Sequence, residues 1–336
     1  MSALTFYIGK KEKMYDVSDF IVKAVSSGAR GKAPRDLTVT LVDSEQIKQI
    51  NTNPDSGLSC ILLVDGKEFF RGIVVSDSRG NGRTVEVKAM DNCMYLTKNK
   101  SSFTFKKKTA TKIFQKAMKE AGFGSASIGS VVNTRHKIKE LTKKGATCWD
   151  VIEDALSQTY SSTGRRYYVS SDKGKISLLL RTETNSMITL SPETNTTQYT
   201  QNRSIESTYT RLKLYTSTNK KKKKTTKVKK KVTNKPLEKR IGQMIDMESV
   251  DKKIKKAELK RKANTWLNTK SKTMCSMSWE GVGDIRAKSG VAINANIPHL
   301  GLSRVLYIES DTHTWQNGSY TMKLTLNFAA SNADAG

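Results

Sequence analysis

Alternating apolar and polar positions predict β-strands through the first hundred residues. Leu37, Val39 and Leu41 alternate with threonines, which is the period of a half-buried strand. Two more strands are expected over 69–75 and 84–90, because an Asn-Gly pair between such segments is a strong hairpin signal. We therefore expect the chain to open with a β-rich unit.

The pattern changes to a helical period in the middle of the chain. Apolar residues from 113 to 121 fall on one helical stripe that follows Thr109 and ends before Gly122. A second helix is expected to begin at Thr147, where Thr147 and Asp150 have the spacing of a capping box. A hairpin over 167–180 follows, so this region predicts a mixed helix and strand unit.

The last third returns to strands around a basic insertion. The segment 320–328 alternates strictly between apolar and polar residues after a turn at Asn317-Gly318. Before it, 212–215 and 228–232 are expected to pair as a long hairpin with a lysine-rich tip at about 216–232. A basic helix is expected at about 250–267, with Val250, Ile254, Ala257 and Trp266 on its apolar side.

Two hairpins at opposite ends of the chain share one pattern. The segment 72–87 reads as a strand, Ser-Asp-Ser, an Asn-Gly pair and a second strand. The segment 306–324 repeats that order with Ser-Asp-Thr. This similarity suggests two related β-barrels that flank a mixed insertion.

Charge is the dominant compositional feature, since 59 basic and 31 acidic residues leave a net charge of +28. Such a balance is typical of proteins with an anionic partner, namely nucleic acid, an acidic membrane surface or an acidic protein. The lysine run contains neither aromatic residues nor arginine, which single-strand grooves and phosphate clamps prefer. A solvated hairpin tip is the favoured interpretation, and electrostatic contact with nucleic acid or an acidic neighbour stays open. The lysines concerned are Lys220, Lys221, Lys222, Lys223, Lys224, Lys227, Lys229, Lys230 and Lys231.

Membrane and redox signals are absent from the sequence. The apolar segments are too short for a membrane span, and the N-terminus lacks the pattern of a signal peptide. Cys60, Cys93, Cys148 and Cys275 stand far apart without a CxxC pair, which favours reduced, partly buried thiols. We expect no metal site and no cofactor.

Enzyme motifs are mostly missing as well. The three histidines do not form HExxH, and the glycines form neither GxxxxGK[ST] nor GxGxxG. The exception is Cys148-Trp149 at a helix start, with His299 downstream, which is similar to papain-like peptidases. Cys148 as an ordinary residue of a capped helix is the favoured interpretation, and a cell-wall hydrolase using Cys148 and His299 is the enzymatic alternative.

Four segments, taken together, resemble one known family. They are 66–73 (GKEFFRGI), the stretch from Cys148 to Ile176, 210–215 (TRLKLY) with the lysine hairpin and basic helix, and 283–322. The chain resembles the tail hub proteins of contractile phages and phage-like bacteriocins, in particular the XkdQ/YqbQ-like group of Gram-positive bacteria. The lysine run is longer than the family pattern, so the resemblance does not assign it a role.

The resemblance implies an α+β, mainly β fold with two related β-barrels around a mixed middle region. The expected domains are a first barrel at 1–105, a middle domain at 106–203, and a second barrel at 204–336 that carries the hairpin and the basic helix. It further implies a non-enzymatic homotrimer, in which two barrels per subunit form a pseudo-sixfold ring between the tail tube and the central spike. Other baseplate proteins are further expected partners, nucleic acid is a less favoured one, and the particle is expected to assemble in the bacterial cytoplasm.

Overall fold

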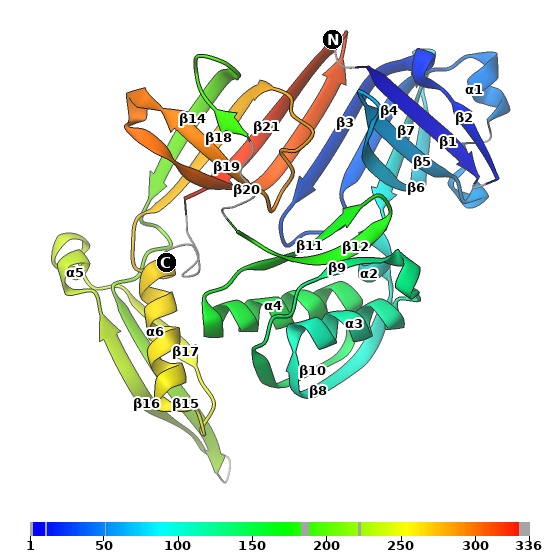
Figure 1. Cartoon of the computed structure of the whole chain (residues 1–336). Coiled ribbons are helices and arrows are strands. Elements are labelled where there is room, and N and C mark those ends of the chain that lie inside the picture. Colours follow the sequence, from blue (N-terminus) through cyan, green and yellow to red (C-terminus); the bar gives the residue numbers. More distant parts are fainter. Residues whose placement is uncertain (1–2, 11, 51, 183–187, 221–222, 329–336) are drawn as a thin grey trace.

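Most strands of the chain belong to one large sheet (Figure 1). The computed structural model describes residues 3–10, 12–50, 52–182, 188–220 and 223–328. Within them, 13 strands form a sheet whose main path runs β14-β18-β21-β20-β3-β4-β7-β6-β5-β1-β2. In addition, β19 pairs with β20, and β13 pairs with β19. The fold is therefore mainly β, as expected.

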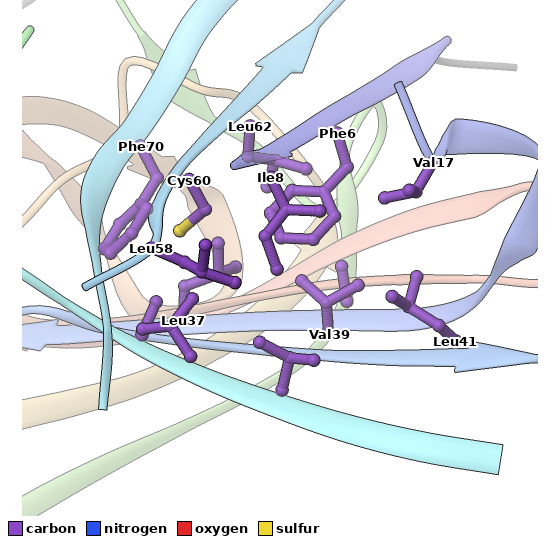
Figure 2. Close-up of a cluster of buried hydrophobic side chains, with 14 of the residues drawn as sticks. Phe6, Ile8, Val17, Leu37, Val39, Leu41, Leu58, Cys60, Leu62 and Phe70 are labelled. Carbon is purple, nitrogen blue, oxygen red and sulfur yellow. The ribbon is translucent and has the colours of Figure 1, made fainter. Parts of the chain in front are cut away.

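The N-terminal part of the large sheet surrounds the first hydrophobic core (Figure 2). Leu37, Val39 and Leu41 are fully buried and pack with Phe6 and Leu62, which confirms the predicted alternation. A short helix, α1 (Glu45–Gln49), follows β4. The strands are β1 (Leu4–Lys10), β2 (Lys13–Asp16), β3 (Ile21–Ala29), β4 (Asp36–Val42), β5 (Ser59–Val64), β6 (Lys67–Arg79) and β7 (Thr84–Asp91).

The C-terminal part of the sheet encloses a second core around the fully buried Trp279. In β21, Met322, Leu324 and Leu326 are buried between exposed neighbours, as the alternation predicts. The strands are β13 (Thr189–Leu190), β14 (Thr196–Ser204), β18 (Met274–Val282), β19 (Ala292–Ile297), β20 (Leu302–Gln316) and β21 (Ser319–Asn327). Asn317 and Gly318 both have positive φ (52° and 70°), which is the geometry of a type I′ hairpin turn.

A mixed unit with its own core lies between the two parts in sequence, below the large sheet in Figure 1. Thr147 and Asp150 form the predicted capping box at the start of α4, and Gly164 ends that helix with a positive φ of 77°. The predicted hairpin forms from β11 and β12. The elements are α2 (Cys93–Lys98), β8 (Lys100–Thr109), α3 (Ala110–Glu120), β9 (Ile128–Val131), β10 (Lys137–Thr147), α4 (Cys148–Thr163), β11 (Tyr167–Asp172) and β12 (Lys175–Leu180).

A small lysine-rich unit is inserted between β14 and β18. Its three-stranded sheet packs against α6 through Leu212, Leu214, Val250 and Trp266. The elements are β15 (Arg211–Lys220), β16 (Lys223–Thr233), α5 (Lys235–Ile241), β17 (Ile245–Ser249) and α6 (Lys256–Lys270). The predicted lysine hairpin is thus present, formed by β15 and β16.

Two local expectations need correction. The basic helix begins at Lys256, so Val250 and Ile254 reach the core from the segment before it. Asp251 accepts a hydrogen bond from the Lys253 amide (2.7 Å), an Asx turn that delays the helix. The Asn-Gly pair near residue 81 lies in a loop of four residues rather than a two-residue turn, and Arg83 takes the positive φ of 55° there.

The two parts of the large sheet repeat one strand order. In the N-terminal part the path is β3-β4-β7-β6-β5-β1, and in the C-terminal part it is β14-β18-β21-β20-β19-β13. Corresponding strands also follow one another in the same chain order, from β1 and β13 to β7 and β21. One difference is that β1 is antiparallel to β5, whereas β13 is parallel to β19.

Irregularities in strand register fall at corresponding positions in the two parts. The β6–β7 pairing shifts between Val74 and Ser76, and the β20–β21 pairing shifts between Ile308 and Ser310. These residues are the ones that align when the two Ser-Asp hairpins are matched. Because β-bulges are specific features rather than defects, a shared bulge indicates a shared strand plan.

A second pair of bulges agrees with the first. The β3–β4 pairing shifts between Ile21 and Lys23, and the β14–β18 pairing shifts between Thr196 and Gln198. These two sites also correspond when the residue pairings are traced from the first pair of bulges, through β7 and β4 in the N-terminal part and through β21 and β18 in the C-terminal part. In the described residues neither part forms a closed barrel, since the pairing continues as an open path from β14 to β2.

Candidate functional site

The junction between β3 and β20 joins the two parts of the sheet. Strand β20 pairs with β19 along its first half and with β3 along its second half, from Ser310 opposite Ala29 to Gln316 opposite Lys23. Trp315 of β20 therefore lies in the core of the N-terminal part. This strand pairing makes the two halves one continuous structure.

A buried ion pair crosses this junction. Arg35 donates from both terminal guanidinium nitrogens to Asp311, at 2.6 and 2.7 Å, in a bidentate arrangement. The Asp311 side chain is fully buried, and it also accepts a hydrogen bond from the Ser289 amide (2.6 Å). Burial alone would raise the pKa of Asp311, but the Arg35 charge and the hydrogen bonds from His313 and Arg35 hold it well below its usual range.

Gly28 leaves the space through which Arg35 reaches Asp311. A Cβ atom at Gly28 would lie 2.5 Å from a terminal nitrogen of Arg35. Gly28 pairs directly with Asp311 across the junction. The small residue on β3 and the arginine just before β4 therefore act together to place one positive charge opposite the aspartate.

A second ionic cluster lies at the same junction, centred on Glu309. Arg30 (2.7 Å) and Arg181 (2.8 Å) both donate to its carboxylate. Arg181 is 1% exposed, and its guanidinium stacks 3.8 Å from the Tyr307 ring centroid. Burial lowers the pKa of Arg181 to about 10, although Glu309 opposes that shift. The N-terminal part, the middle unit and β20 thus share one set of charges.

Aromatic residues complete the junction. His313 is fully buried. Its Nδ1 atom shares a hydrogen bond of 2.8 Å with the Tyr320 hydroxyl, and its Nε2 atom lies 3.1 Å from the Ala287 carbonyl oxygen. Phe69 packs edge-on against both His313 and Trp315. Lys288 donates to the Phe69 carbonyl (2.8 Å), and burial lowers the pKa of Lys288 to about 8. These contacts pack β20 against Phe69 and Lys288, next to a small cavity of about 40 Å³ that Gly28, Arg35 and Lys288 line.

The lysine hairpin is anchored at its base and exposed beyond it. Lys270 of α6 donates to Asp246 (2.9 Å) and Glu248 (3.1 Å) of β17, and Trp266 donates to Asp246 (2.7 Å). Further along, Lys227 and Lys229 are exposed. Ion pairs thus lie near the base of the hairpin, at α6 and also at α5, where Arg211 of β15 binds Glu238 (2.5 Å).

The nine predicted contact lysines divide by how much of them is described. Lys227, Lys229 and Lys231 are exposed and Lys230 is half-buried. Lys221 and Lys222 lie outside the described residues, and the backbone of Lys220, Lys223 and Lys224 is described without their side chains. The strand partners of the described lysines on β15 are polar, basic or apolar, so no acidic residue of β15 pairs with them.

The outer face of the small sheet combines these lysines with exposed apolar side chains. Val228 is 38% exposed and Met247 is 50% exposed, on the face opposite Leu212 and Leu214. Lys213 pairs with Lys231 on one side and with Met247 on the other, so basic residues surround the apolar ones. This surface is suited to a partner that is both acidic and partly apolar.

A cleft of about 420 Å³ separates the small unit from the middle unit. Lys139 of β10 forms an ion pair with Asp251 (2.5 Å) across it, and α4 packs against α6 nearby. The cleft is lined by charges of both signs, with Glu140 and Glu258 beside Arg261 and Lys262. The Lys139–Asp251 ion pair and the packing of α4 against α6 join the two units beside this cleft.

The enzymatic alternative finds no support in geometry. Cys148 is buried at the first position of α4, and burial raises the pKa of its thiol, which disfavours the thiolate that a nucleophile requires. His299 lies exposed in a short 3₁₀ turn after β19, and no hydrogen bond joins the two residues. All four cysteines are free thiols.

The described part of the chain contains neither a cluster of metal-binding side chains nor a membrane-spanning helix. No group of three or more His, Cys, Asp or Glu side chains there could hold a metal ion. None of the helices in that part is both long and apolar enough to cross a membrane.

Sequence reasoning missed the junction because its charges are isolated in sequence. Arg35 and Asp311 stand 276 residues apart, and nothing in either neighbourhood marks a pair. The only available signal was the Ser-Asp motif shared by the two hairpins, in which Asp311 corresponds to Asp77. The motif indicates the repeat but does not indicate the ion pair.

Comparison with known proteins places these features in context. A family model described as YQBQ-like matches residues 25–327. The phage-like element PBSX protein XkdQ of Bacillus subtilis (strain 168) is 29% identical over 309 residues, covering 91% of this chain and 92% of XkdQ.

Solved structures share the fold at low sequence identity. The tail protein from Neisseria meningitidis MC58 has a TM-score of 0.69 at 12% identity, covering 97% of this chain and 96% of that protein. The E. coli c3393 protein has a TM-score of 0.57 at 11% identity, covering 94% of this chain and 75% of that one. That protein is described as a component of the type VI secretion system with structural similarity to the T4 bacteriophage tail proteins gp27 and gp5.

Proposed function

The chain belongs to the YQBQ-like family, and from that premise we propose that it is the structural hub of a contractile, phage-type tail baseplate. Family and fold together identify a phage tail hub-like protein. The finer role is that three copies form a pseudo-sixfold ring, which joins the sixfold tail tube to a threefold central spike.

One observation carries this proposal, namely the repeated strand plan. Two sheet units with the same strand order and the same two bulge positions give each subunit two similar docking surfaces. A sixfold tube cannot dock evenly on a threefold partner unless each subunit offers two equivalent surfaces. The duplication therefore supplies the symmetry that such an adaptor needs.

Each unit is proposed to curve into a barrel, with the middle domain and the small lysine-rich unit outside the ring. At the start of the first unit, the Val17 amide donates to the Phe6 carbonyl (2.9 Å) and the Phe6 amide donates to the Ser18 hydroxyl (2.9 Å). These bonds bring the beginning of β3 close to β1, which supports curvature toward closure. The proposed units span about 3–91, 93–182 and 189–328, instead of the expected 1–105, 106–203 and 204–336, because α2 and β8 pack in the core of the middle unit and β13 and β14 pair within the C-terminal sheet.

The role is proposed to be binding rather than catalysis. Ion pairs join β20 to the N-terminal part and to the middle unit, as expected of a rigid connector. Arg35 binds Asp311, and one terminal nitrogen of Arg181 binds Glu309, while its other two guanidinium nitrogens have no hydrogen-bond partner among the described residues. Mechanical load between tube and spike would be carried by the strand pairing and by the Arg35–Asp311 ion pair. The protein is proposed to reside in the tail baseplate of a phage or phage-like particle and to assemble in the bacterial cytoplasm.

Mass measurement of the purified full chain, alone and with candidate tube and spike proteins, tests the role. We expect a species of three times 37.4 kDa that binds both partners. A chain that stays monomeric with both partners present would contradict the hub. Cleavage of peptidoglycan by the purified chain would instead favour the hydrolase alternative.

The lysine hairpin is proposed to be a solvated tip whose secondary role is electrostatic contact with an acidic neighbouring protein. The exposed apolar residues Val228 and Met247 among the lysines favour a protein over nucleic acid. Exchange of Lys227, Lys229 and Lys231 to glutamine tests this contact. Particles that incorporate the variant normally would show that the tip is only solvated, and loss of DNA binding at low salt would favour nucleic acid.

A further inference from the structure

Two of the unpaired strand edges in the described chain belong to β14 and to the second half of β6. Strand β14 pairs with β18 on one side only. Strand β6 pairs with β7 through Arg79 but with β5 only as far as Ile73, so its edge beyond that point carries no strand. Nine-residue β14 contains neither proline nor lysine, the usual means of blocking an edge.

The repeat shows which strands occupy the corresponding edges. In the repeat, β14 corresponds to β3 and β6 corresponds to β20. Within the chain, β3 and β20 pair with each other along those same edges. We propose that β14 of one copy pairs antiparallel with β6 of a neighbouring copy of this chain, in the register that β3 and β20 use within the chain. This inference rests on the proposed trimeric ring and specifies how its subunits join.

The register follows from the pairings already described. Lys23 corresponds to Gln198, and Ser310 corresponds to Ser76. These two matches assign each residue of β3 to one residue of β14 and each residue of β20 to one residue of β6. The pairs expected between copies are Ser76 with Ser204, Asp77 with Arg203, Ser78 with Asn202, and Arg79 with Gln201. Ser78, Asn202 and Arg203 are exposed in the single chain.

Charge supports this register independently. Within the chain, Asp311 faces Gly28 and binds Arg35. In the repeat, Asp77 corresponds to Asp311, and Arg203 corresponds to Gly28. The two units therefore carry the arginine at different positions. Arg203 lies on β14 at the position that Gly28 has on β3, and its pairing partner Cys275 takes the position of Arg35. Each junction would then hold one arginine side chain against one aspartate: Arg35 reaches Asp311 past Gly28, and Arg203 would lie directly opposite Asp77 with Cys275 beside it.

The loop beside β6 leaves room for the added strand. The Thr52 hydroxyl donates to Asp77 (2.7 Å), just as the Ser289 amide donates to Asp311 (2.6 Å). The Val74 amide donates to the Leu58 carbonyl (2.9 Å). Its counterpart, a bond from the Ile308 amide to the Val291 carbonyl (3.0 Å), lies on β20 two residues before the pairing with β3 begins at Ser310. The same loop arrangement therefore accommodates a strand in the second unit.

Cysteine cross-linking of the purified full chain tests the register. In a Cys275→Ser background, the pair Ser78→Cys with Asn202→Cys should form disulfides between copies, in a ladder that ends at three chains. The offset pair Ser78→Cys with Thr200→Cys should give at least about tenfold less product, because its Cα atoms would lie beyond bridging distance. Ser27→Cys with Thr312→Cys, the corresponding pair within the chain, is the positive control.

A charge exchange provides the second measurement. Arg203→Glu should weaken association by about tenfold or more, and Asp77→Lys in the same chain should restore it. Arg240→Glu, at an exposed arginine on α5, is the matched control and should leave association unchanged.

The outcomes separate the two proposals. The β14–β6 contact would be overturned, and the trimeric ring left in place, by either of two results. In one, trimers form but the offset pair cross-links with the same yield as the in-register pair. In the other, trimers form but neither pair cross-links. Monomers at all concentrations would overturn both. A ladder confined to the in-register pair, with rescue of Arg203→Glu, supports the contact.

Discussion

At the level of single residues, the junction depends on a few buried charges that satisfy one another. Arg35, Asp311 and Glu309 lie where β3 and β20 meet, and each has an opposite charge within hydrogen-bond distance. Burying such groups is costly unless they are paired. Their arrangement therefore fixes how the two sheet units are oriented, more than it adds to stability.

Asp311→Asn should be strongly destabilising, because it leaves the Arg35 guanidinium buried without its carboxylate. We expect a loss of about 3–5 kcal/mol in the free energy of unfolding, measured by denaturant titration. Asp284→Asn is the matched control, since its partner Arg286 is 53% exposed, and should cost below about 1 kcal/mol. Equal losses in the two variants would show that the junction pair has no special weight.

Asp91 should give the opposite pH dependence to a typical carboxylate. Burial raises the pKa of Asp91 to about 6. The hydrogen bond from the Cys93 amide and the charge of Arg35 both lower this pKa but do not offset the effect of burial. Between its unfolded pKa near 4 and pH 6 the folded chain binds more protons, so stability falls as pH rises.

The comparison of wild type with Asp91→Asn isolates this effect, because other carboxylates cancel. The free energy of unfolding of the wild type, relative to the variant, should decrease by up to about 3 kcal/mol between pH 4 and pH 7. If the difference in free energy of unfolding between wild type and variant does not change over this pH range, Asp91 has the same pKa in the folded and the unfolded chain.

Cys148 should be dispensable for function. It lies under the capped first turn of α4, and burial raises the pKa of its thiol. Cys148→Ala should cost about 1 kcal/mol of stability and preserve assembly with tail partners. A variant that unfolds normally but loses a lytic activity of the wild type would reverse this interpretation.

At the level of elements, local patterns predicted much and tertiary context decided the rest. The helix at Thr147 and the strand at 319–327 follow from capping and alternation alone. Strand β3 was not predicted, because it contains Ser26, Ser27 and Gly28 where an apolar alternation would be expected. Gly28 leaves the space that the Arg35 guanidinium occupies, a requirement that no local pattern shows.

The lysine hairpin should be separable from its base. Replacing residues 217–226 by Asn-Gly would join Thr216 to Lys227, which already face each other across the strand pair. We expect cooperative unfolding with a change below about 1 kcal/mol, because the removed tip is remote from Leu212 and Leu214. Leu214→Ala, in the same hairpin but in its core, should cost about 2–5 kcal/mol.

Thermal or denaturant unfolding of both variants decides this point. A shortened hairpin that destabilises the chain as much as Leu214→Ala would show that the tip packs against another part of the protein. A shortened chain that folds but no longer enters particles would identify the tip as a contact site.

At the level of the whole molecule, the duplication is the feature that sequence and structure share. The two Ser-Asp hairpins suggested it, and the matching strand order and bulges agree with it. Sequence could not show that the two units share one sheet, because the β3–β20 pairing joins residues nearly 300 positions apart. Nor could it show the small unit between β14 and β18 as a separate core.

The central claim is that three copies form a ring of six similar sheet units. A reconstruction of the purified full chain by electron microscopy, calculated without imposed symmetry, tests it most directly. The account predicts a threefold ring in which the 4–91 and 189–327 sheet units alternate at sixfold spacing around a central channel. A monomer, a ring with another number of chains, or a trimer whose two sheet units lie at unequal radii would contradict it.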